Sequence, residues 1–493
     1  MRRRDFITLL SGLAAWPLDV RAQQLSVAMS SEKRVGSIAR GSNVLTLTET
    51  SSFRVGDQVI VEVGGEAGQG QFGTMGVGGV VPAATDGWSA FYYRSKDCPM
   101  ALVAKVTAIA DGGRTLRLDK LAATDATNAH VYFDNHPLLE AVLMENHPPG
   151  WAVTLPAGDF AISDTLHHQS YGGWTMSGAG RGVTILRSPK GVPGGGLHCF
   201  QADDTEIRDF TIIGNAGQSG FGLKDHDNRI EYGVGVLVTK SSNCTIRNVS
   251  CVNVFRKAAW GEYTNNLQVY DCDLTINDPF RGYLEWWFGV SDSVNGEFTN
   301  CQTESAYLIP GFEGFRSDGV KFIGCRSVNA SFSMNSTGNF VIDSPNVTIK
   351  AGSQFDLASF HFQNPIFNIN SNIQPPNEAM RMGGLIRNVS LTCEGYINSD
   401  NDSLRGIVIN ADNPNVTIDG GVMTYPDYAA PSKMPGACGI NSTGPNTQVR
   451  DVTVTGTVNP DNYPGANIAV TNGAVKNCKA RRILVAGVLH GSR

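Results

Sequence analysis

The sequence predicts an all-β fold: a right-handed parallel β-helix, or solenoid, preceded by a small β-rich domain. Glycine accounts for 56 of the 493 residues, and asparagine, serine and threonine also recur at short intervals, as in proteins made of many short strands and turns. Sustained amphipathic helical patterns are scarce. The chain is too long for one ordinary compact core, which favours two domains or an elongated repeat fold.

The N-terminal segment, residues 1–22, predicts export. It combines a run of arginines, a short apolar stretch and a small-residue cleavage site, as signal peptides do. Arg3 and Arg4, followed by an Asp-Phe pair, resemble the bacterial twin-arginine signal. The apolar stretch is too short to span a bilayer. We therefore expect a periplasmic or secreted protein that starts at Gln23 and has no membrane contact after the signal is removed.

The charge and the cysteines exclude some partners. A net charge of −6 argues against nucleic acid, which binds basic surfaces. The 10 cysteines form no Cys-x-x-Cys pair and no His/Cys metal spacing, so we expect no metal and no cofactor. Twin-arginine substrates fold before export in a reducing compartment, which favours free buried thiols over disulfides.

Residues 23–135 form the predicted β-rich domain. Alternating apolar patterns at 43–48, 55–62, 101–107 and 115–118 indicate strands, and a glycine-rich insertion at 64–87 interrupts them. The pattern is typical of a small open barrel. Such a domain would cap the end of the solenoid, where core and strand edges are otherwise exposed; a second interpretation is a glycan-binding module.

Residues 136–493 contain the irregular repeats of the predicted solenoid and a C-terminal tail. One short alternating strand after a turn residue recurs as Asn243-Cys-Thr-Ile246, Asn346-Val-Thr-Ile349 and Asn415-Val-Thr-Ile418. A second phrase centres on Cys251, Cys272, Cys301 and Cys325, at intervals of 21, 29 and 24 residues, which is the length of one coil plus variable loops. We expect these four cysteines to stack in one column as small buried apolar groups.

Three segments, at 153–162, 174–186 and 207–214, carry a likeness to a known superfamily. The first contains Pro156-Ala-Gly158 ahead of Phe160 and Ile162, and the other two continue as a second and third coil. Over residues 136–480 the chain resembles the pectin-lyase-like right-handed parallel β-helix superfamily. The resemblance implies the fold, but no particular reaction, because one solenoid hosts many chemistries. The motif sets of its polygalacturonases, calcium-dependent lyases and alginate epimerases are absent, whereas its fructotransferases remain compatible.

An alignment of coils on their turns predicts the functional face. The strands before the turns are taken as 236–239, 260–263, 287–290 and 312–315. Because side chains alternate between faces, this register gathers Trp260, Glu262, Trp287 and Phe312 on one face. We expect that face to point outward as an aromatic, carboxylate-bearing surface. If it points inward, the rings are core and Glu313 becomes the exposed acid.

The residues on and beside this face suit sugar chemistry. Aromatic rings fit the apolar faces of sugars, and glycoside hydrolysis needs two carboxyl groups at a defined separation. The predicted catalytic candidates are Glu262, Glu285, Asp278, Asp225, Asp227, Glu231 and Arg281. The predicted substrate-binding candidates are Trp260, Tyr263, Trp287, Phe312, Lys257 and Tyr283.

These residues predict an exported enzyme that cleaves or rearranges a poly- or oligosaccharide by carboxylate acid–base catalysis, as a glycoside hydrolase or transglycosylase, with a fructotransferase-like reaction among the options. One alternative is a polysaccharide lyase or epimerase acting on uronates, which needs a base and a neutralising cation. Another is a non-catalytic glycan-binding or tailspike-like protein. The sequence is compatible with a monomer or a homotrimer.

Overall fold

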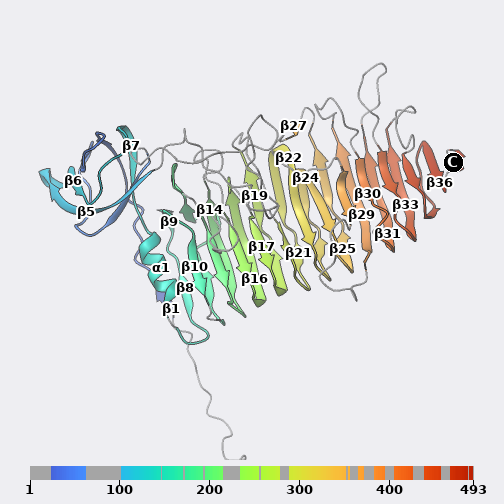
Figure 1. The fold of residues 1–493 in the computed structure, drawn as a ribbon, viewed down its shortest axis with the longest axis horizontal. Coiled ribbons are helices and arrows are strands. Elements are labelled where there is room, and N and C mark those ends of the chain that lie inside the picture. Colours follow the sequence, from blue (N-terminus) through green and yellow to red (C-terminus); the bar gives the residue numbers. More distant parts are fainter. Residues whose placement is uncertain are drawn as a thin grey trace, which may run out of the picture.

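The computed structural model describes residues 24–62, 101–145, 147–169, 172–192, 195–214, 234–254, 257–277, 288–350, 354–355, 365–370, 382–394, 405–425, 438–456, 467–486 and 488–491. Over these residues the chain is a right-handed parallel β-helix with a small β-barrel at its N-terminal end (Figure 1). The fold is the one that the resemblance to the pectin-lyase-like superfamily implies.

Three parallel sheets run along the solenoid, and each coil adds one strand to each sheet in chain order. The first sheet is built by β10 (Leu166–Gln169), β13 (Leu197–Phe200), β15 (Val236–Thr239), β17 (Ala259–Glu262), β20 (Phe288–Ser291), the C-terminal parts of β22 (Gln302–Phe315) and β24 (Arg326–Asn335), β28 (Pro365–Asn370), β30 (Arg405–Ile409), β32 (Cys438–Ser442), β34 (Ile468–Val470) and β36 (Arg482–Val485).

The second sheet contains β1 (Gln24–Ser26), β8 (Ala152–Thr154), β11 (Thr175–Ser177), the N-terminal parts of β14 (Glu206–Ile213) and β16 (Ser242–Val252), β18 (Asn265–Tyr270), β21 (Glu297–Thr299), β23 (Lys321–Ile323), β25 (Phe340–Asp343), the N-terminal parts of β29 (Gly384–Cys393), β31 (Val416–Thr424) and β33 (Thr447–Thr455), and β35 (Gly473–Lys476).

The third sheet contains β9 (Gly158–Ala161), β12 (Thr184–Arg187), β19 (Asp273–Ile276), β26 (Asn346–Ile349) and the remaining parts of β14, β16, β22, β24, β29, β31 and β33. The short strand β27 (Gln354–Phe355) pairs with the middle of β22. At the C-terminal end, β37 (Val488–Gly491) pairs antiparallel with β36.

Left-handed backbone at the corners bends the chain from sheet to sheet. At the corner between the first and second sheets, from Gln201 to Asn339, each coil has two such residues three positions apart, as at Tyr263 and Asn266. Buried hydroxyls sit between them and join neighbouring coils: the backbone N–H of Ser293 donates to Ser317 Oγ at 3.1 Å. Asparagine is frequent at these positions because it tolerates this conformation.

The interior is filled by columns of stacked side chains. Phe288, Phe312, Phe332 and Phe367 follow one another along the first sheet with ring centroids 5.5, 4.5 and 5.1 Å apart. Parallel strands lie about 4.8 Å apart, so one ring per coil gives close stacking. This column, together with apolar residues of the other sheets, forms a single long core.

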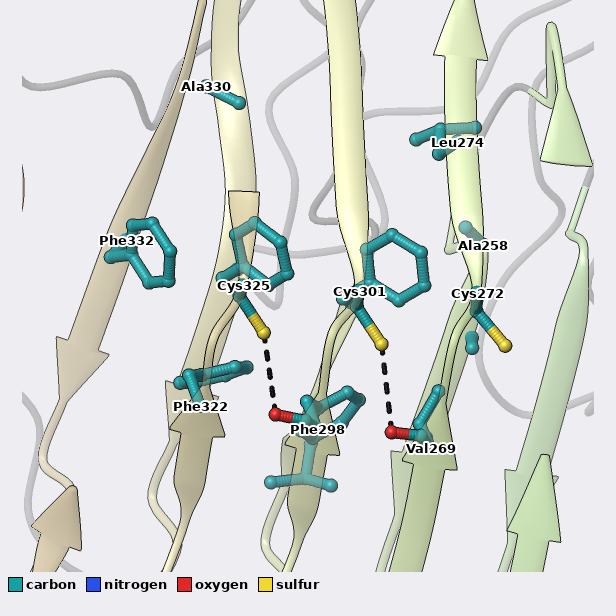
Figure 2. Close-up of a cluster of buried hydrophobic side chains, with 14 of the residues drawn as sticks. Ala258, Val269, Cys272, Leu274, Phe298, Cys301, Phe322, Cys325, Ala330 and Phe332 are labelled. Carbon is teal, nitrogen blue, oxygen red and sulfur yellow. Dashed lines mark hydrogen bonds between the residues drawn. The ribbon is translucent and has the colours of Figure 1, made fainter. Parts of the chain in front are cut away.

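The cysteine column is confirmed for three of its four predicted members. Cys272, Cys301 and Cys325 follow one another at the corner between the second and third sheets (Figure 2). The Sγ of Cys301 and that of Cys325 donate to carbonyls of the preceding coil. The prediction is wrong for Cys251, which lies two residues further on, in β16, and pairs with Leu274.

The described cysteines are free thiols, as expected: Cys199, Cys244, Cys251, Cys272, Cys301, Cys325, Cys393 and Cys478. Burial raises the pKa of the Cys272 thiol to about 12. These thiols therefore pack as apolar groups rather than serve as nucleophiles.

The N-terminal barrel is closed, whereas an open one was predicted. Its strands run in the order β2 (Lys33–Ile38), β3 (Val44–Leu47), β6 (Thr115–Leu118), β5 (Leu102–Ala110), β4 (Gln58–Val61) and β7 (Ala126–Phe133). A short 3₁₀ turn, Asp111–Gly113, joins β5 to β6. Closure removes the free strand edges that an open barrel would leave.

The end of the solenoid is covered by α1 (His136–Met144), whose Leu139 and Leu143 join the solenoid core. The barrel packs beside it, with Ile60 and Tyr132 against Ala161 of β9. β1 precedes the barrel in the chain but pairs with β8, so the solenoid begins before the barrel does.

Replacing Asn248 with alanine is expected to lower the free energy of unfolding by about 2 kcal/mol, because alanine adopts left-handed backbone at a cost and a side-chain hydrogen bond is lost. Asn248 has a φ of 52°, and its Nδ2 donates to Asp209 Oδ1 at 2.7 Å. Glycine at this position should recover most of the backbone contribution. Denaturant titration followed by tryptophan fluorescence measures the change; N346A, on an exposed strand position, is the control. Wild-type stability in N248A would contradict the prediction.

Candidate functional site on the outer surface of the first sheet

The first sheet has an inner and an outer row of side chains. Ala259, Phe288 and Phe312 are register partners and face the core. The next position along each strand faces outward, and there Trp260, Gly289 and Glu313 are partners. Two positions beyond Trp260, Glu262 continues the outer surface.

The predicted face is therefore half correct. Trp260 and Glu262 lie in the outer row, but the Trp260 ring is covered rather than exposed as predicted. Phe312 is fully buried between Phe288 and Phe332 and belongs to the core. The reason is register: β17 and β20 each lie one residue away from the position assigned from the sequence, and a one-residue shift exchanges the two faces of a strand.

Lys257 and Glu262 form an ion pair beside this surface. The Lys257 ammonium contacts Glu262 Oε1 and lies 5.5 Å from the centroid of the Trp260 ring. Lys257 is only 5% exposed, and a buried ammonium requires a charged partner. The contact places a charged carboxylate at a fixed point on the outer surface.

Trp260 is 3% exposed and packs against Val234 and Leu237. Its ring reaches over the next coil, because a Cβ at Gly289 would lie 2.7 Å from Trp260 Cζ3. Glycine at 289 is thus required for this placement. The indole Nε1 is buried and has no hydrogen-bond partner among the residues that the structure describes.

A second carboxyl group, Asp292, lies one coil further along. Ser291 is the register partner of Glu262, so Asp292 is diagonal to Glu262 on the neighbouring coil. Strand spacing and rise place their Cα atoms about 6 Å apart. Burial raises the pKa of the Asp292 carboxyl, although the Arg316 guanidinium, whose Nε is 3.2 Å from Asp292 Oδ1, pulls the pKa down.

Tyr263 lies between these charges and is largely exposed. Burial of part of its ring, followed by the negative charges of Asp292 and Glu262, raises the pKa of its phenol. The side chain therefore offers a neutral hydroxyl and an open aromatic ring next to both carboxyl groups.

The backbone at this corner is costly. Tyr263, Asp292 and Arg316 occupy equivalent positions on successive coils, with φ of 52°, 50° and 47°. Left-handed backbone at such residues costs about 1–2 kcal/mol each, and glycine or asparagine would adopt it more easily. The same corner position is also left-handed at Lys240 and Ser336 on other coils, so the conformation belongs to the solenoid corner and only the side chains differ.

Sequence reasoning missed Asp292 and Arg316, and it placed Glu313 on the exposed side only in the alternative register. Asp292 and Arg316 occupy the corner position of Tyr263 on the next two coils, so aligning the corner residues rather than the strand ends would have set these two beside Tyr263. Glu313 is 1% exposed and lies two coils from Trp260 in the same outer row.

Several predicted site residues lie outside the described part of the chain. They are Asp225, Asp227, Glu231, Asp278, Arg281, Tyr283, Glu285 and Trp287. Among the described residues, no cluster of three or more His, Cys, Asp or Glu side chains is arranged to hold a metal ion. Within the same residues, no helix has the length and apolar character needed to cross a bilayer.

Comparisons with known proteins find similar solved structures only at low identity. No protein-family model matches the sequence, and a search of curated proteins finds no match. Among solved structures, DFA-IIIase from Arthrobacter chlorophenolicus A6, solved without its lid, is similar over 70% of this chain and 95% of that chain, with 12% identity and a TM-score of 0.47. The N-terminal fragment of bacteriophage phi29 gene product 12 is similar over 72% of this chain and 70% of that chain, with 14% identity and a TM-score of 0.45.

A third similar structure is the catalytic domain of a GH87 α-1,3-glucanase in complex with nigerose. The likeness covers 92% of this chain and 88% of that chain, with 12% identity and a TM-score of 0.36. At these identities the three similarities concern the solenoid fold alone.

Truncation of Phe312 to alanine is expected to destabilise the protein by about 3–5 kcal/mol, because it opens a cavity inside the ring column. F315A, at an outward position of the same strand, is the matched variant and should cost less. Thermal or denaturant unfolding measures both. A variant F312A that unfolds like wild type but binds sugar poorly would restore the original assignment of this residue.

Proposed function

We propose that this chain is an exported carbohydrate-active enzyme that cleaves or rearranges a poly- or oligosaccharide by acid–base catalysis between carboxyl groups on the outer surface of the first sheet. One observation supports this most strongly: Glu262 and Asp292 lie diagonally on adjacent coils, each beside a cation, Glu262 with Lys257 and Asp292 with Arg316. Glycosidic catalysis uses two carboxyl groups held at a defined separation.

Asp292 suits the role of general acid. Because burial raises its pKa, the carboxyl retains its proton to a higher pH than an exposed aspartate would. In the reaction this proton passes to the glycosidic oxygen as the bond between that oxygen and the anomeric carbon breaks.

Glu262 suits the role of base or nucleophile, since its contact with the Lys257 ammonium fixes the position of its carboxyl group on the outer surface. It either accepts a proton from the attacking water or sugar hydroxyl, or attacks the anomeric carbon directly. Water as acceptor gives hydrolysis, and a second sugar gives transfer. The exposed ring of Tyr263 offers a surface for the apolar face of a sugar next to both groups.

The lyase or epimerase alternative has less support. Such a reaction needs a base that removes a proton beside the sugar carboxylate and a cation that neutralises this carboxylate. Tyr263 is the phenol beside the two carboxyl groups, but its raised pKa disfavours the phenolate that would act as the base. The Lys257 ammonium, which could act as the cation, already contacts Glu262. A product that absorbs through a new unsaturated bond would establish the lyase reaction instead.

The variants E262Q and D292N are each expected to lower kcat/KM by about 100-fold or more on a cleaved glycan, because each removes one partner of the acid–base pair. Digestion of a polysaccharide panel by the protein, followed by reducing-end assay, identifies the substrate. E297Q, an ion-paired glutamate on the second sheet, is the control. E231Q and E285Q test the two other predicted glutamates. Full activity in both E262Q and D292N, with folding intact, would refute the pair.

Removing the positive charge in R316M should move the alkaline limb of the kcat/KM profile to higher pH. Arg316 lowers the pKa of Asp292, so its loss lets the general acid stay protonated further up the pH scale. R387M, which breaks a comparable ion pair on the second sheet, should leave the limb in place. A limb that moves to lower pH in R316M would mean that Asp292 is not the acid.

A further inference from the structure

The outer surface of the first sheet continues past the carboxyl pair as a surface of amides. Asn335 in β24 and Asn370 in β28 occupy the row of Glu262. Asn368 occupies the row of Trp260 and Glu313. Asn368 and Asn370 are 7% and 3% exposed. We call Asn335, Asn368 and Asn370 the amide surface.

The side-chain oxygen of each of these amides accepts no hydrogen bond from the residues that the structure describes. The Oδ1 atoms of Asn335, Asn368 and Asn370 are all buried. Buried polar atoms are nearly always paired because leaving one unpaired costs free energy. Three such atoms on neighbouring positions of two adjacent coils point to a ligand that supplies donors.

We infer that the amide surface is an accessory subsite for a neutral, hydroxyl-rich part of the glycan, which specifies the substrate class of the proposed function and rests on it. Sugar hydroxyls donate hydrogen bonds, whereas carboxylates and sulfates only accept them. A sugar face that presents hydroxyls therefore pairs with the three oxygens, whereas a carboxylate or sulfate on that face would pair with none of them.

The spacing fits an extended chain that runs along the solenoid axis. Four strand steps separate Glu262 from Asn370, which is about 19 Å at the usual strand spacing. Bond cleavage at Glu262 and Asp292 would then occur at one end of the bound segment, while the amide surface binds units several sugars away. Ser291 and the outward Phe315 lie in the row between them.

Titration calorimetry tests the subsite without requiring turnover. The full chain is titrated with malto-, xylo- and fructo-oligosaccharides of increasing length, and with oligogalacturonates of equal lengths. We expect affinity for a neutral series to rise with length and affinity for the charged series not to. N370L should weaken binding of the long members by about tenfold and leave the short ones unchanged.

Two further variants control for effects of a leucine on the surface and for loss of folding. N346L, an exposed asparagine on the third sheet, should bind like wild type. N370D keeps an acceptor and a polar side chain, so it should bind long neutral chains better than N370L. If circular dichroism shows that N370L does not fold, the binding of N370D is compared with that of wild type instead.

The two proposals fail separately. Length-dependent neutral binding that N370L abolishes, without any cleavage, would leave the subsite standing and refute the catalysis. Equal binding of long chains by N370L and N346L would overturn the subsite even where cleavage proceeds. Tighter binding of oligogalacturonates, or no neutral series whose affinity grows with length, would overturn it as well.

Discussion

The register of the coils is the constraint on which this molecule depends, and the corners set it. Strands of the first sheet have few residues, and neighbouring side chains point to opposite faces, so a shift of one residue would exchange core and surface. Left-handed residues at fixed positions, with hydroxyls such as those of Ser293 and Ser317 between them, prevent that shift. The rings of Phe288 and Phe312 then meet inside, and Trp260 and Glu262 stay outside.

The same constraint explains what the sequence could and could not predict. Repeated phrases and turn residues suffice for the fold, because any solenoid with this coil length buries one alternate set of side chains. The cysteine spacing also predicted the column of Cys272, Cys301 and Cys325. The prediction that Cys251 belongs to this column was wrong, because a cysteine packs equally well at a corner and inside a strand. Residue type alone therefore does not determine the position.

The site was harder to predict because its residues must be placed to within one position. Glu262 was predicted on the outward face and lies there, since a glutamate beside a tryptophan on a strand is conspicuous. Phe312 was assigned to the wrong face because aromatic residues occur on both faces of these strands, and hydrophobicity does not distinguish a stacked core ring from a sugar platform. Asp292 and Arg316 lie at corners of the coil, where charged residues are common. Only their position beside Tyr263 on neighbouring coils makes them candidates for the site.

The outer surface is not what stability alone would select. Lys257 is 5% exposed and Glu313 is 1% exposed, and desolvation of such charges costs free energy that pairing only partly offsets. Apolar residues of similar volume would often be more stable at such positions. Two buried ionisable side chains, Lys257 and Glu313, thus lie on one surface of one sheet, beside the carboxyl groups of Glu262 and Asp292. This concentration is the physical reason to place the chemistry there rather than elsewhere on the solenoid.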